Sequence, residues 1–347
     1  MNLHQEQAHL RRIVKSFSNL SVTVLGDLVA DEFVLGDIAR VSREAPVLIL
    51  HHRESRILPG GGGNAALNLA ALGVHVNFAG IVGNDASGTQ LLALLKQHKI
   101  STTGIVRMPG YVTPTKTRVL ASMLQAARQQ VVRIDREPEA VDPRHPMLKQ
   151  LVHAAREFAP AADAMLVSDY GYGAATPRLL AAIRSGGLYG ETPVTLDSRY
   201  RMTEYKHLTA ATPNQPEVEE ALGVRLENDK EKLTAAGRRL MSRMELESLV
   251  ITRGANGMFA FEGERPPLTI PVHGSDQPID VTGAGDTVIA VLTAALAASA
   301  GTALAAKLAN LAGGLVVMKR GTATVSSEEL LDAINGEHTA ARPRKKK

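Results

Sequence analysis

The sequence predicts an α/β protein in which a mostly parallel central sheet is flanked by helices and a small β-sheet projects from this body. Two observations carry this prediction. From about Pro143 onward, short apolar runs alternate with helical stretches, which is typical of βαβ units and parallel strands. Before that point, several strand-like segments alternate apolar with polar residues, so that one face of each strand would be open to water. Such one-sided strands do not fit a layer covered by helices, and they predict a second, smaller sheet.

The N-terminal part of the chain supplies most of the predicted projecting sheet. An apolar run at 22–25 ends in Gly26-Asp27, which indicates a buried strand that opens into a loop. One-sided strands are then predicted at 33–41, 46–52, 117–122 and 131–135. The last two are predicted to form a hairpin around AARQ, residues 126–129. The projecting sheet, or lid, would thus be built from roughly 33–53 and 110–135.

The rest of the chain is predicted to form one body. Its first helix starts near Asn64 and ends before Gly73, because a glycine often follows the last turn of a helix. The other elements are strands at 76–82, 164–168, 194–197 and 248–252, and helices at 88–98, 177–185, 217–221, 230–241 and after Gly283. No internal repeat or long linker divides the sequence, so residues 1–335 are predicted to form one domain. Residues 336–347 are predicted to be a basic, disordered tail.

Composition restricts the functions that the protein could have. Of the 347 residues, 44% are apolar and 21% are charged, which is ordinary for a globular protein. The absence of Cys excludes disulfides, thiolate metal sites and a Cys nucleophile. The N-terminus lacks a signal-peptide core, and the best apolar run, 288–300, is too short to span a membrane. The net charge of +4 depends partly on the terminal ARPRKKK, without any aromatic RNA-binding signature. We therefore expect a cytoplasmic protein without nucleic-acid or membrane partners.

The stretch IDVTGAGDTV, residues 279–288, is the best candidate for catalysis. Two glycines at a predicted helix start leave backbone N–H groups bare, and these groups form an anion site together with the helix dipole. Asp286 lies beside this site, where it would repel a phosphate but could accept a proton from a hydroxyl that attacks one. The alternative is that Thr282 and Asp286 only cap the helix. The apolar helix that follows would bury this turn, which favours the catalytic interpretation because a carboxylate is costly to bury without partners.

Five motifs, in the right order, resemble those of the ribokinase-like (PfkB) carbohydrate kinases. IDVTGAGDTVIAVLTAALA resembles the C-terminal signature, and LPGGGGNAALNLAALG resembles the N-terminal glycine-rich signature. VLGDLVADEF resembles the opening strand with its substrate-binding Asp, TPNQPEVEEALG the N-x-x-E motif, and VITRGANGMF the strand and turn along the nucleotide. The resemblance covers nearly the whole chain and implies a ribokinase-like fold and an ATP-dependent sugar kinase.

A narrower resemblance concerns the D-glycero-D-manno-heptose-7-phosphate kinases. The segments that carry it are GDIARVSREAPVLIL, TPTKTRVLA, VVRID, LVSDYGYGA, DVTGAGDTVIAVLTAALAA and KRGTATVS. These kinases serve ADP-heptose synthesis for lipopolysaccharide, and many are fused to an adenylyltransferase domain. This chain stops near the end of the kinase region, so the resemblance implies only the kinase activity and leaves open a separate adenylyltransferase as a partner. Where those kinases usually have Asp-Pro-Lys-Gly, this chain has Asp197-Ser198-Arg199-Tyr200.

The resemblance implies roles on the sugar side of the site. Asp286 would be the general base, and the anion hole would be formed by the amides of Gly283, Ala284 and Gly285. Asp27 and Asn64 would bind sugar hydroxyls, because a carboxylate and an amide suit a polyol. The backbone would approach the sugar closely at three glycines, Gly60, Gly61 and Gly62.

The resemblance also implies ATP and Mg²⁺. Asn214 and Glu217 would orient Mg²⁺ and its waters near the ATP phosphates, since Mg²⁺ usually keeps several waters. Taken alone, Asn214-Gln215-Pro216-Glu217 favours a helix N-terminus with a capping box. The nucleotide pocket would be shaped by Thr252, Arg253, Gly254 and Gly257, with a plain β-turn as the alternative. Asn310 could approach the adenine or simply lie on a helix surface, and a requirement for K⁺ stays open.

A substrate that already carries phosphate needs cations. The candidates are Lys116, Arg118 and Arg133 on the predicted lid and Arg199 after a strand. Lys116 and Arg118 rank first because TKTR lies in a segment that resembles the heptose kinases, although each cation alone also fits a solvated surface. Other enzyme classes do not match, since the sequence has no P-loop, no dinucleotide fingerprint at its first βα turn and no G-x-S-x-G motif.

The sequence therefore predicts transfer of the γ-phosphoryl group of ATP to a sugar hydroxyl, with O1 of heptose 7-phosphate as the acceptor. Closure of the lid would exclude water and limit ATP hydrolysis. Two alternatives stay open: a kinase of the same family for another sugar, sugar phosphate or nucleoside, and a sugar- or nucleotide-binding regulator without catalysis. A homodimer is expected, because lid sheets with an exposed face often pair between subunits.

Overall fold

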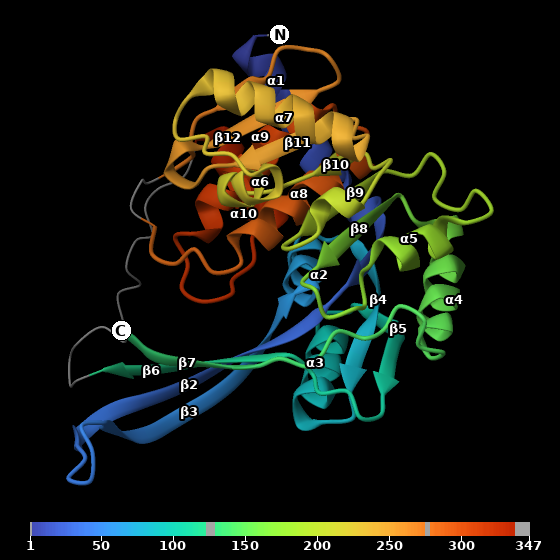
Figure 1. Ribbon diagram of the computed structural model, residues 1–347. Coiled ribbons are helices and arrows are strands. Elements are labelled where there is room, and N and C mark those ends of the chain that lie inside the picture. Colours follow the sequence, from blue (N-terminus) through green and yellow to red (C-terminus); the bar gives the residue numbers. More distant parts are fainter. Residues whose placement is uncertain (1, 123–128, 275–277, 337–347) are drawn as a thin grey trace.

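The body of the protein is built on one central sheet (Figure 1). The computed structural model describes residues 2–122, 129–274 and 278–336, and within them the sheet has nine strands in the order β13-β12-β11-β10-β9-β8-β1-β4-β5. These strands are β1 (Ser21–Gly26), β4 (His75–Gly83), β5 (Ser101–Met108), β8 (Ala164–Asp169), β9 (Val194–Ser198), β10 (Ala210–Ala211), β11 (Ser248–Thr252), β12 (Met258–Glu262) and β13 (Leu268–Ile270). Neighbours from β5 to β11 pair in parallel, and β12 and β13 add antiparallel pairs. The predicted mostly parallel sheet is confirmed.

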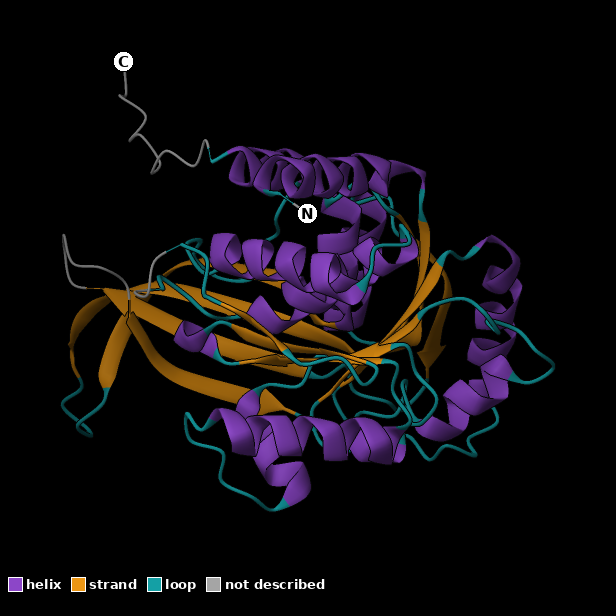
Figure 2. Cartoon of the chain, turned by 90° about the horizontal axis from the view of Figure 1, so that it is seen from above, coloured by secondary structure: helices purple, strands orange, loops and turns teal. Residues whose placement is uncertain are grey.

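Helices cover both faces of this sheet (Figure 2). One group shares a hydrophobic core and consists of α1 (Leu3–Ser16), α2 (Gly62–Ala71), α3 (Ala86–Gln97), α8 (Ala284–Ala297), α9 (Thr302–Val316) and α10 (Ser327–Asn335). The other group shares a second core and consists of α4 (Leu148–Phe158), α5 (Pro177–Arg184), α6 (Gln215–Leu222) and α7 (Lys230–Met244). The strands supply both cores by alternation, since in β8 Leu166 belongs to the first core and Val167 to the second. Short 3₁₀ turns lie at Phe17–Asn19, Ala159–Ala161, Met202–Glu204 and Gly254–Asn256.

A second sheet projects from this body as a long ribbon (Figure 1). Among the described residues it has the strand order β3-β2-β6-β7, formed by β2 (Leu28–Val41), β3 (Leu48–Gly61), β6 (Thr115–Ser122) and β7 (Gln129–Arg136). β2 and β6 pair in parallel, whereas the two outer pairs are antiparallel. We call this the projecting sheet. β7 is exposed at every residue, so this strand is open to water on both faces rather than on one as predicted.

β2 and β3 extend further toward the body than the sequence predicted. The predicted strands cover 33–41 and 46–52, but β2 begins at Leu28 and β3 continues to Gly61. Residues 28–31 are buried on both faces, and residues 53–56 are exposed on both. Neither segment alternates, so hydrophobic periodicity cannot mark it as a strand. These extensions carry Asp31 and Gly61 to the edge of the body.

The sequence interpretation missed several elements, among them α1, α4 and β5. The first could have been found, because Asn2 and Gln5 form a capping box at its start. The predicted AARQ hairpin falls largely on 123–128, and the predicted tail on 337–347; both segments lie outside the described residues. In the part of the chain that the structure describes, no helix is long and apolar enough to cross a membrane.

The order of the strands reverses between β1 and β8. From β1 the chain moves outward through β4 and β5, and it then returns to β8 and proceeds to β9, β10 and β11 on the other side. In open α/β sheets, ligands bind at the carboxyl ends of the strands beside such a switch point. The segments that follow β1, β8 and β9 are therefore where a functional site is expected.

Candidate active site

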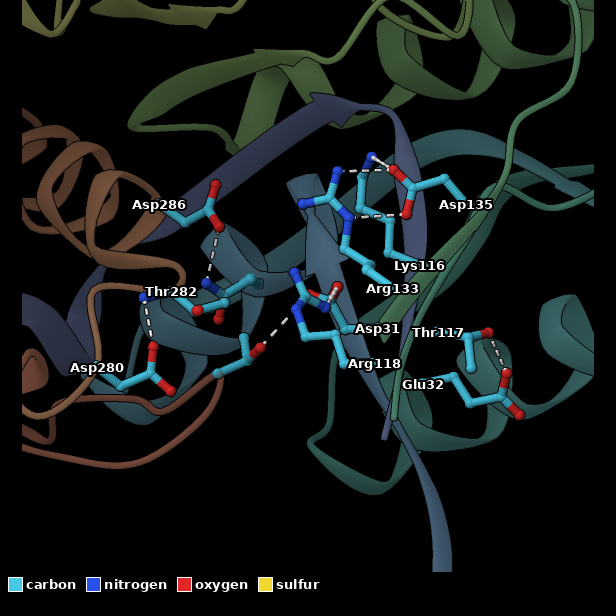
Figure 3. A network of polar contacts seen from close by, with 12 residues as sticks. Asp31, Glu32, Lys116, Thr117, Arg118, Arg133, Asp135, Asp280, Thr282 and Asp286 are labelled. Atoms are coloured by element: carbon cyan, nitrogen blue, oxygen red, sulfur yellow. Dashed lines mark hydrogen bonds and ion pairs between the residues drawn. The ribbon is translucent and has the colours of Figure 1, made fainter. Parts of the chain in front are cut away.

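A polar cavity of about 370 Å³ lies at these carboxyl ends, between the body and the projecting sheet. Its charged lining residues are Asp31, Lys116, Arg118, Arg133, Asp197, Arg199, Glu217 and Asp286. Figure 3 shows that Asp286 comes from a helix of the body, while the cations that it labels come from neighbouring strands of the projecting sheet. We call this space the acceptor cavity. It contains the predicted base together with all four predicted phosphate-binding cations.

Asp286 is buried in the first turn of α8, with 5% of its surface exposed. Its Oδ2 accepts a hydrogen bond from Nδ2 of Asn64 at 2.8 Å, and its Oδ1 accepts one from the Tyr170 hydroxyl at 2.8 Å. Burial, assisted by the negative charge of Asp31, raises the pKa of Asp286 to about 7, against the opposing effect of these two hydrogen bonds. A carboxyl group with a pKa near neutrality suits proton abstraction from a hydroxyl.

The start of α8 faces the acceptor cavity through three small residues. Gly283, Ala284 and Gly285 all line the cavity, as expected for an anion hole. Gly283 has φ +77°, and a side chain at this position would collide with the amide of Asn64. The N–H of Ala284 donates to the carbonyl of Val281 at 3.2 Å, so this amide already has a partner within the turn. The positive end of the helix dipole nevertheless points at the cavity.

Asn64, a predicted sugar ligand, does not line the acceptor cavity but contacts Asp286. It is fully buried, and its Nδ2 also donates to the carbonyl of Gly283 at 3.3 Å. Its Oδ1 accepts from Nδ2 of Asn68 at 3.2 Å, so both ends of the amide are used within the protein. The sequence placed this residue among the sugar ligands because the pattern gives no direction for its side chain. In the structure it supports the candidate base.

Asp27, the other predicted sugar ligand, does not line the acceptor cavity either. Its carboxylate is buried and accepts backbone hydrogen bonds from Tyr170 at 2.9 Å, Tyr172 at 3.1 Å and Ala174 at 2.8 Å. Burial and the charge of Asp169 raise the pKa of Asp27 to about 6. The acid of this motif that lines the acceptor cavity is Asp31. VLGDLVADEF contains both acids, and only the strand geometry of β2 decides which one reaches the cavity.

The predicted glycines make room for side chains of the site. A side chain at Gly60 would collide with the carboxylate of Asp31. Gly61, with φ +57°, lines the acceptor cavity, and an added Cβ would lie 3.3 Å from the Tyr170 ring. An added Cβ at Gly62 would lie 3.1 Å from Cα of Gly26. Of these three glycines, Gly61 therefore reaches the cavity and the other two permit close packing beside it.

The four cations already have partners within the protein. Nζ of Lys116 lies 3.0 Å from Oε1 of Glu137 and 3.6 Å from Oδ2 of Asp135. Nη2 of Arg133 lies 2.8 Å from the same Oδ2 of Asp135, and Arg118 pairs with Asp31 (Figure 3). The guanidinium of Arg199 lies over the ring of Tyr200, 5.7 Å from its centre. These pairs hold the cations around one space in which a phosphate group would meet several donors.

Asn214 and Glu217 satisfy both interpretations of their motif. Oδ1 of Asn214 accepts from the N–H of Glu217 at 2.9 Å, and Oε2 of Glu217 accepts from the N–H of Asn214 at 2.9 Å, which is a capping box on α6. Both residues also line the acceptor cavity, and burial raises the pKa of Glu217. Within the described residues, no cluster of three or more His, Cys, Asp or Glu side chains could hold a metal by itself. Mg²⁺ needs only one or two carboxylates besides waters and substrate phosphates, so these oxygen donors fit it.

A second, mostly apolar cavity of about 250 Å³ lies on the other side of the α8 turn. The predicted nucleotide-binding residues that line it are Thr252, Gly254, Gly257 and Asn310. It shares Thr252, Val281, Ala284 and Gly285 with the acceptor cavity, so the two spaces meet at the start of α8. Arg253 turns away, since its Nε donates to Gln215 and its Nη2 to Asn228. We call this space the apolar cavity.

Fold and site together define a ribokinase-like phosphotransferase: a buried acid and a helix N-terminus stand between one polar and one apolar cavity. The chain belongs to the pfkB family of carbohydrate kinases, whose sequence pattern matches residues 24–330. The predicted family and enzyme class, a kinase with an alcohol group as acceptor, are thereby confirmed. Membership of this family implies ATP and Mg²⁺.

Curated relatives match over nearly the whole chain. The bifunctional protein HldE of Geobacter sulfurreducens is 39% identical over 335 residues, which cover 96% of this chain and 66% of that protein. HldE of Chromohalobacter salexigens is 40% identical over 320 residues, covering 91% of this chain and 64% of that protein. The chain thus spans about two thirds of the length of these relatives.

Solved structures confirm the ribokinase-like fold. Phosphofructokinase-2 from Escherichia coli in complex with potassium superposes with a TM-score of 0.74 at 17% identity, covering 91% of this chain and 98% of that one. Ribokinase from Arabidopsis thaliana, complexed with ribose and ATP, superposes with a TM-score of 0.69 at 19% identity and the same coverage.

Asp31, Tyr170 and Asp197 line the acceptor cavity, although the sequence interpretation gave them no role. Asp197 and Tyr170 each lie at or just after the carboxyl end of a body strand, a position that the strand pattern could have drawn attention to. Burial and the charges of Asp286 and Glu217 raise the pKa of Asp197. Asp31 carries no comparable signal, because it lies inside the buried part of β2.

Proposed function

We propose that this carbohydrate kinase transfers the γ-phosphoryl group of ATP to O1 of D-glycero-D-manno-heptose 7-phosphate, in ADP-heptose synthesis for lipopolysaccharide. One observation carries the choice of a phosphorylated sugar: Lys116, Arg118, Arg133 and Arg199 line the same cavity as Asp286. A neutral sugar would leave these cations with only their partners in the protein, whereas a phosphate at the far end of a sugar would add charged contacts to several of them. The HldE relatives and the heptose-kinase segments of the sequence support the choice of heptose.

The proposed chemistry uses residues of both cavities. The sugar hydroxyl oxygen forms a bond to the γ-phosphorus, the bond from that phosphorus to the bridging oxygen of ADP breaks, and the hydroxyl proton passes to Asp286. Asp31, at the edge of the cavity, accepts hydrogen bonds from other sugar hydroxyls. The start of α8 stabilises the negative charge on the transferred group. Mg²⁺, when bound on the side of Asn214 and Glu217, neutralises phosphate charge.

The nucleotide base would occupy the apolar cavity, beside Thr252, Gly254, Gly257 and Asn310. In this proposal the phosphates of ATP would lie at the turn of α8 that both cavities share, between the adenine and the sugar. Because one similar structure of phosphofructokinase-2 is a complex with potassium, K⁺ is a variable to include in every assay.

Residues 1–335 would act as one kinase domain in the cytoplasm, with the projecting sheet as a lid. This sheet exposes several large apolar side chains, namely Val41, Leu48, Val131, Val132 and Ile134. Water-exposed apolar groups favour burial against a partner surface, so two copies would pair through the sheet as a homodimer. A tetrameric form is known for phosphofructokinase-2 of Escherichia coli. The phosphorylated product would then pass to an adenylyltransferase that acts next in the pathway.

The test is a substrate panel with ADP release as the readout. The kcat/KM for heptose 7-phosphate should exceed that for the same heptose without its phosphate by at least about 100-fold, since contacts from two cations to one phosphate are each worth about 1.5–3 kcal/mol. Phosphorus NMR of the product should show a new phosphate on C1. A preference for ribose or fructose 6-phosphate would reject the heptose assignment and leave the enzyme class intact.

A further inference from the structure

Tyr170 touches the candidate base from the loop after β8. Its hydroxyl donates to Oδ1 of Asp286 at 2.8 Å, and the residue lines the acceptor cavity. The other oxygen of Asp286 is held by Asn64, so the carboxylate is fixed from two sides. Burial and the charge of Asp286 raise the pKa of Tyr170 far above its ordinary value. The phenol therefore stays protonated and acts as a permanent hydrogen-bond donor.

The loop that carries Tyr170 is anchored by a buried carboxylate. Asp27 accepts the backbone N–H groups of residues 170, 172 and 174, which follow β8 at the centre of the sheet. Three such bonds to one carboxylate fix the path of the loop at alternate residues. Asp27 sits at the end of β1, so the position of Tyr170 is set by the rigid middle of the body.

A second buried acid holds the start of this loop. Asp169 accepts two hydrogen bonds from Arg201, at 2.8 Å and 2.7 Å, and one from the hydroxyl of Tyr205 at 3.0 Å. It also accepts the N–H of Gly171 at 3.0 Å. A bidentate ion pair with a fully buried carboxylate is geometrically strict. Asp27 and Asp169 thus clamp the backbone on both sides of Tyr170.

The glycine-rich segment leaves room for the ring of Tyr170. A Cβ at Gly61 would lie 3.3 Å from its Cδ2. The ring therefore packs against the end of β3, where a side chain at position 61 would crowd it. Position 61 therefore favours glycine on two grounds, the positive φ of the backbone and the nearby ring of Tyr170.

We propose that Tyr170 is a positioning residue that, together with Asn64, orients Asp286 and keeps it ionised for proton transfer from the sugar. This inference rests on the proposed role of Asp286 as the base. The hydroxyl donates only to the acid oxygen, so it favours the carboxylate over the carboxylic acid. Loss of the hydroxyl leaves the ionised form of a buried acid with one donor in place of two.

Other charged groups line the same cavity as Asp286 and also influence its titration. Among the described residues, the acids around the cavity are Asp31 from β2, Asp197 from β9 and Glu217 from α6. The cations are Lys116 and Arg118 from β6, Arg133 from β7 and Arg199 after β9. None of these groups is altered by removal of the Tyr170 hydroxyl, so a change in the titration of Asp286 reports on that one bond.

The test compares Tyr170→Phe with the unaltered enzyme. We expect the acid limb of the pH profile of kcat/KM to move up by about one pH unit, because one hydrogen bond to an ionised group is worth about that much. The value of kcat/KM at pH 7 should fall about fivefold, and the deficit should shrink toward pH 9. Tyr172→Phe is the matched control, since its hydroxyl is on the same loop but donates to Glu137 at 2.6 Å. This control should leave the acid limb in place.

A second measurement needs no turnover. Carbon NMR of protein labelled at the Asp carboxyl carbons would follow the titration of Asp286, identified as the signal lost in Asp286→Asn. The titration midpoint should rise by about one pH unit in Tyr170→Phe. If Tyr170→Phe does not fold, 3,5-difluorotyrosine at position 170 replaces it; this more acidic phenol is a stronger donor and should lower the midpoint instead.

The outcomes separate this inference from the proposed function. An unmoved midpoint, or a rate deficit equal at all pH values, would overturn the role of Tyr170. Normal turnover by Asp286→Asn would instead reject Asp286 as the base, whatever Tyr170→Phe does.

Discussion

The two cavities that meet at the start of α8 differ in almost every property. The acceptor cavity has about 370 Å³ and is lined by four acids and four cations. The apolar cavity has about 250 Å³ and is lined mainly by glycines and apolar side chains, with Thr252 and Asn310 as the polar exceptions. A sugar phosphate presents hydroxyls and charge, whereas a purine presents a flat apolar surface. The difference indicates which ligand each cavity suits.

The two cavities are also assembled differently along the chain. The apolar cavity draws on a continuous region, from Thr252 to Val317. The acceptor cavity combines the projecting sheet, which supplies Lys116, with strand ends of the body, which supply Asp197. If the acceptor cavity holds the sugar and the apolar cavity the nucleotide, as proposed, only sugar recognition would depend on the placement of the projecting sheet. A mutation in one cavity should consequently change the KM of one ligand only, except at the turn of α8 that both cavities share.

Asp286→Asn tests the shared turn and should have the largest effect. Loss of a positioned general base should lower kcat by about 1,000-fold, within the range typical of such groups. Affinity for ATP, measured by calorimetry, should stay within about twofold, because the substitution removes no contact in the apolar cavity. Its melting temperature should not fall, since a buried acid with a raised pKa is replaced by a neutral amide. A rate near that of the unaltered enzyme would contradict the assignment of the base.

Lys116→Ala should affect only the acceptor cavity. Its ammonium group is within reach of the cavity, and its loss should raise KM for the phosphorylated sugar about tenfold, while KM for ATP changes less than about twofold. The contacts of Lys116 with Glu137 and Asp135 in the free protein reduce the effect below that of an unpaired cation. Arg53→Ala is the control, because Arg53 lies on the same sheet and pairs with Asp37 away from the cavity. Equal rises for sugar and ATP would count against the phosphate-binding role.

The pH dependence of the unaltered enzyme should also differ between the sugar and ATP. Burial raises the pKa of Asp286 to about 7, and a base must be ionised to accept a proton. The value of kcat/KM for the sugar should therefore fall as the pH drops through about 7, by about tenfold for each further unit. ATP affinity should show no transition that follows Asp286. A flat sugar profile from about pH 8 to about pH 5.5 would show that Asp286 does not limit the reaction.

The sequence predicted those features of the fold and site that depend on local pattern. Parallel strands such as β8 and β11 were predicted almost to the residue, because each is a short apolar run between turns. The four cations were predicted from motif context and meet in one cavity. The full extent of β2 and β3 was not predicted, since residues 28–31 and 53–56, in the parts of these strands nearer the body, lack alternation.

The direction of each side chain could not be read from the sequence. Asp27 and Asp31 lie in one motif, yet the first anchors the loop at Tyr170 and the second lines the cavity. Asn64 lies within the glycine-rich signature but points at Asp286. Such choices depend on contacts between segments that lie far apart along the chain, as residues 64 and 286 do. Periodicity and spacing carry no information about these contacts.

Asn310→Ala should give the smallest effect. Unlike Lys116→Ala, it should change KM for ATP and not KM for the sugar. Asn310 lines the apolar cavity, and its Nδ2 donates to the carbonyl of Pro271 at 2.8 Å. Loss of one neutral hydrogen-bonding group costs about 1 kcal/mol, so KM for ATP should rise about fivefold while KM for the sugar stays unchanged. Steady-state kinetics with each substrate varied in turn would measure both values. Together with Lys116→Ala, this variant tests each cavity separately, because each substitution should raise KM only for the ligand of its own cavity. A rise confined to the sugar would mean that the apolar cavity does not hold the nucleotide, and the assignment of the two spaces would have to be exchanged.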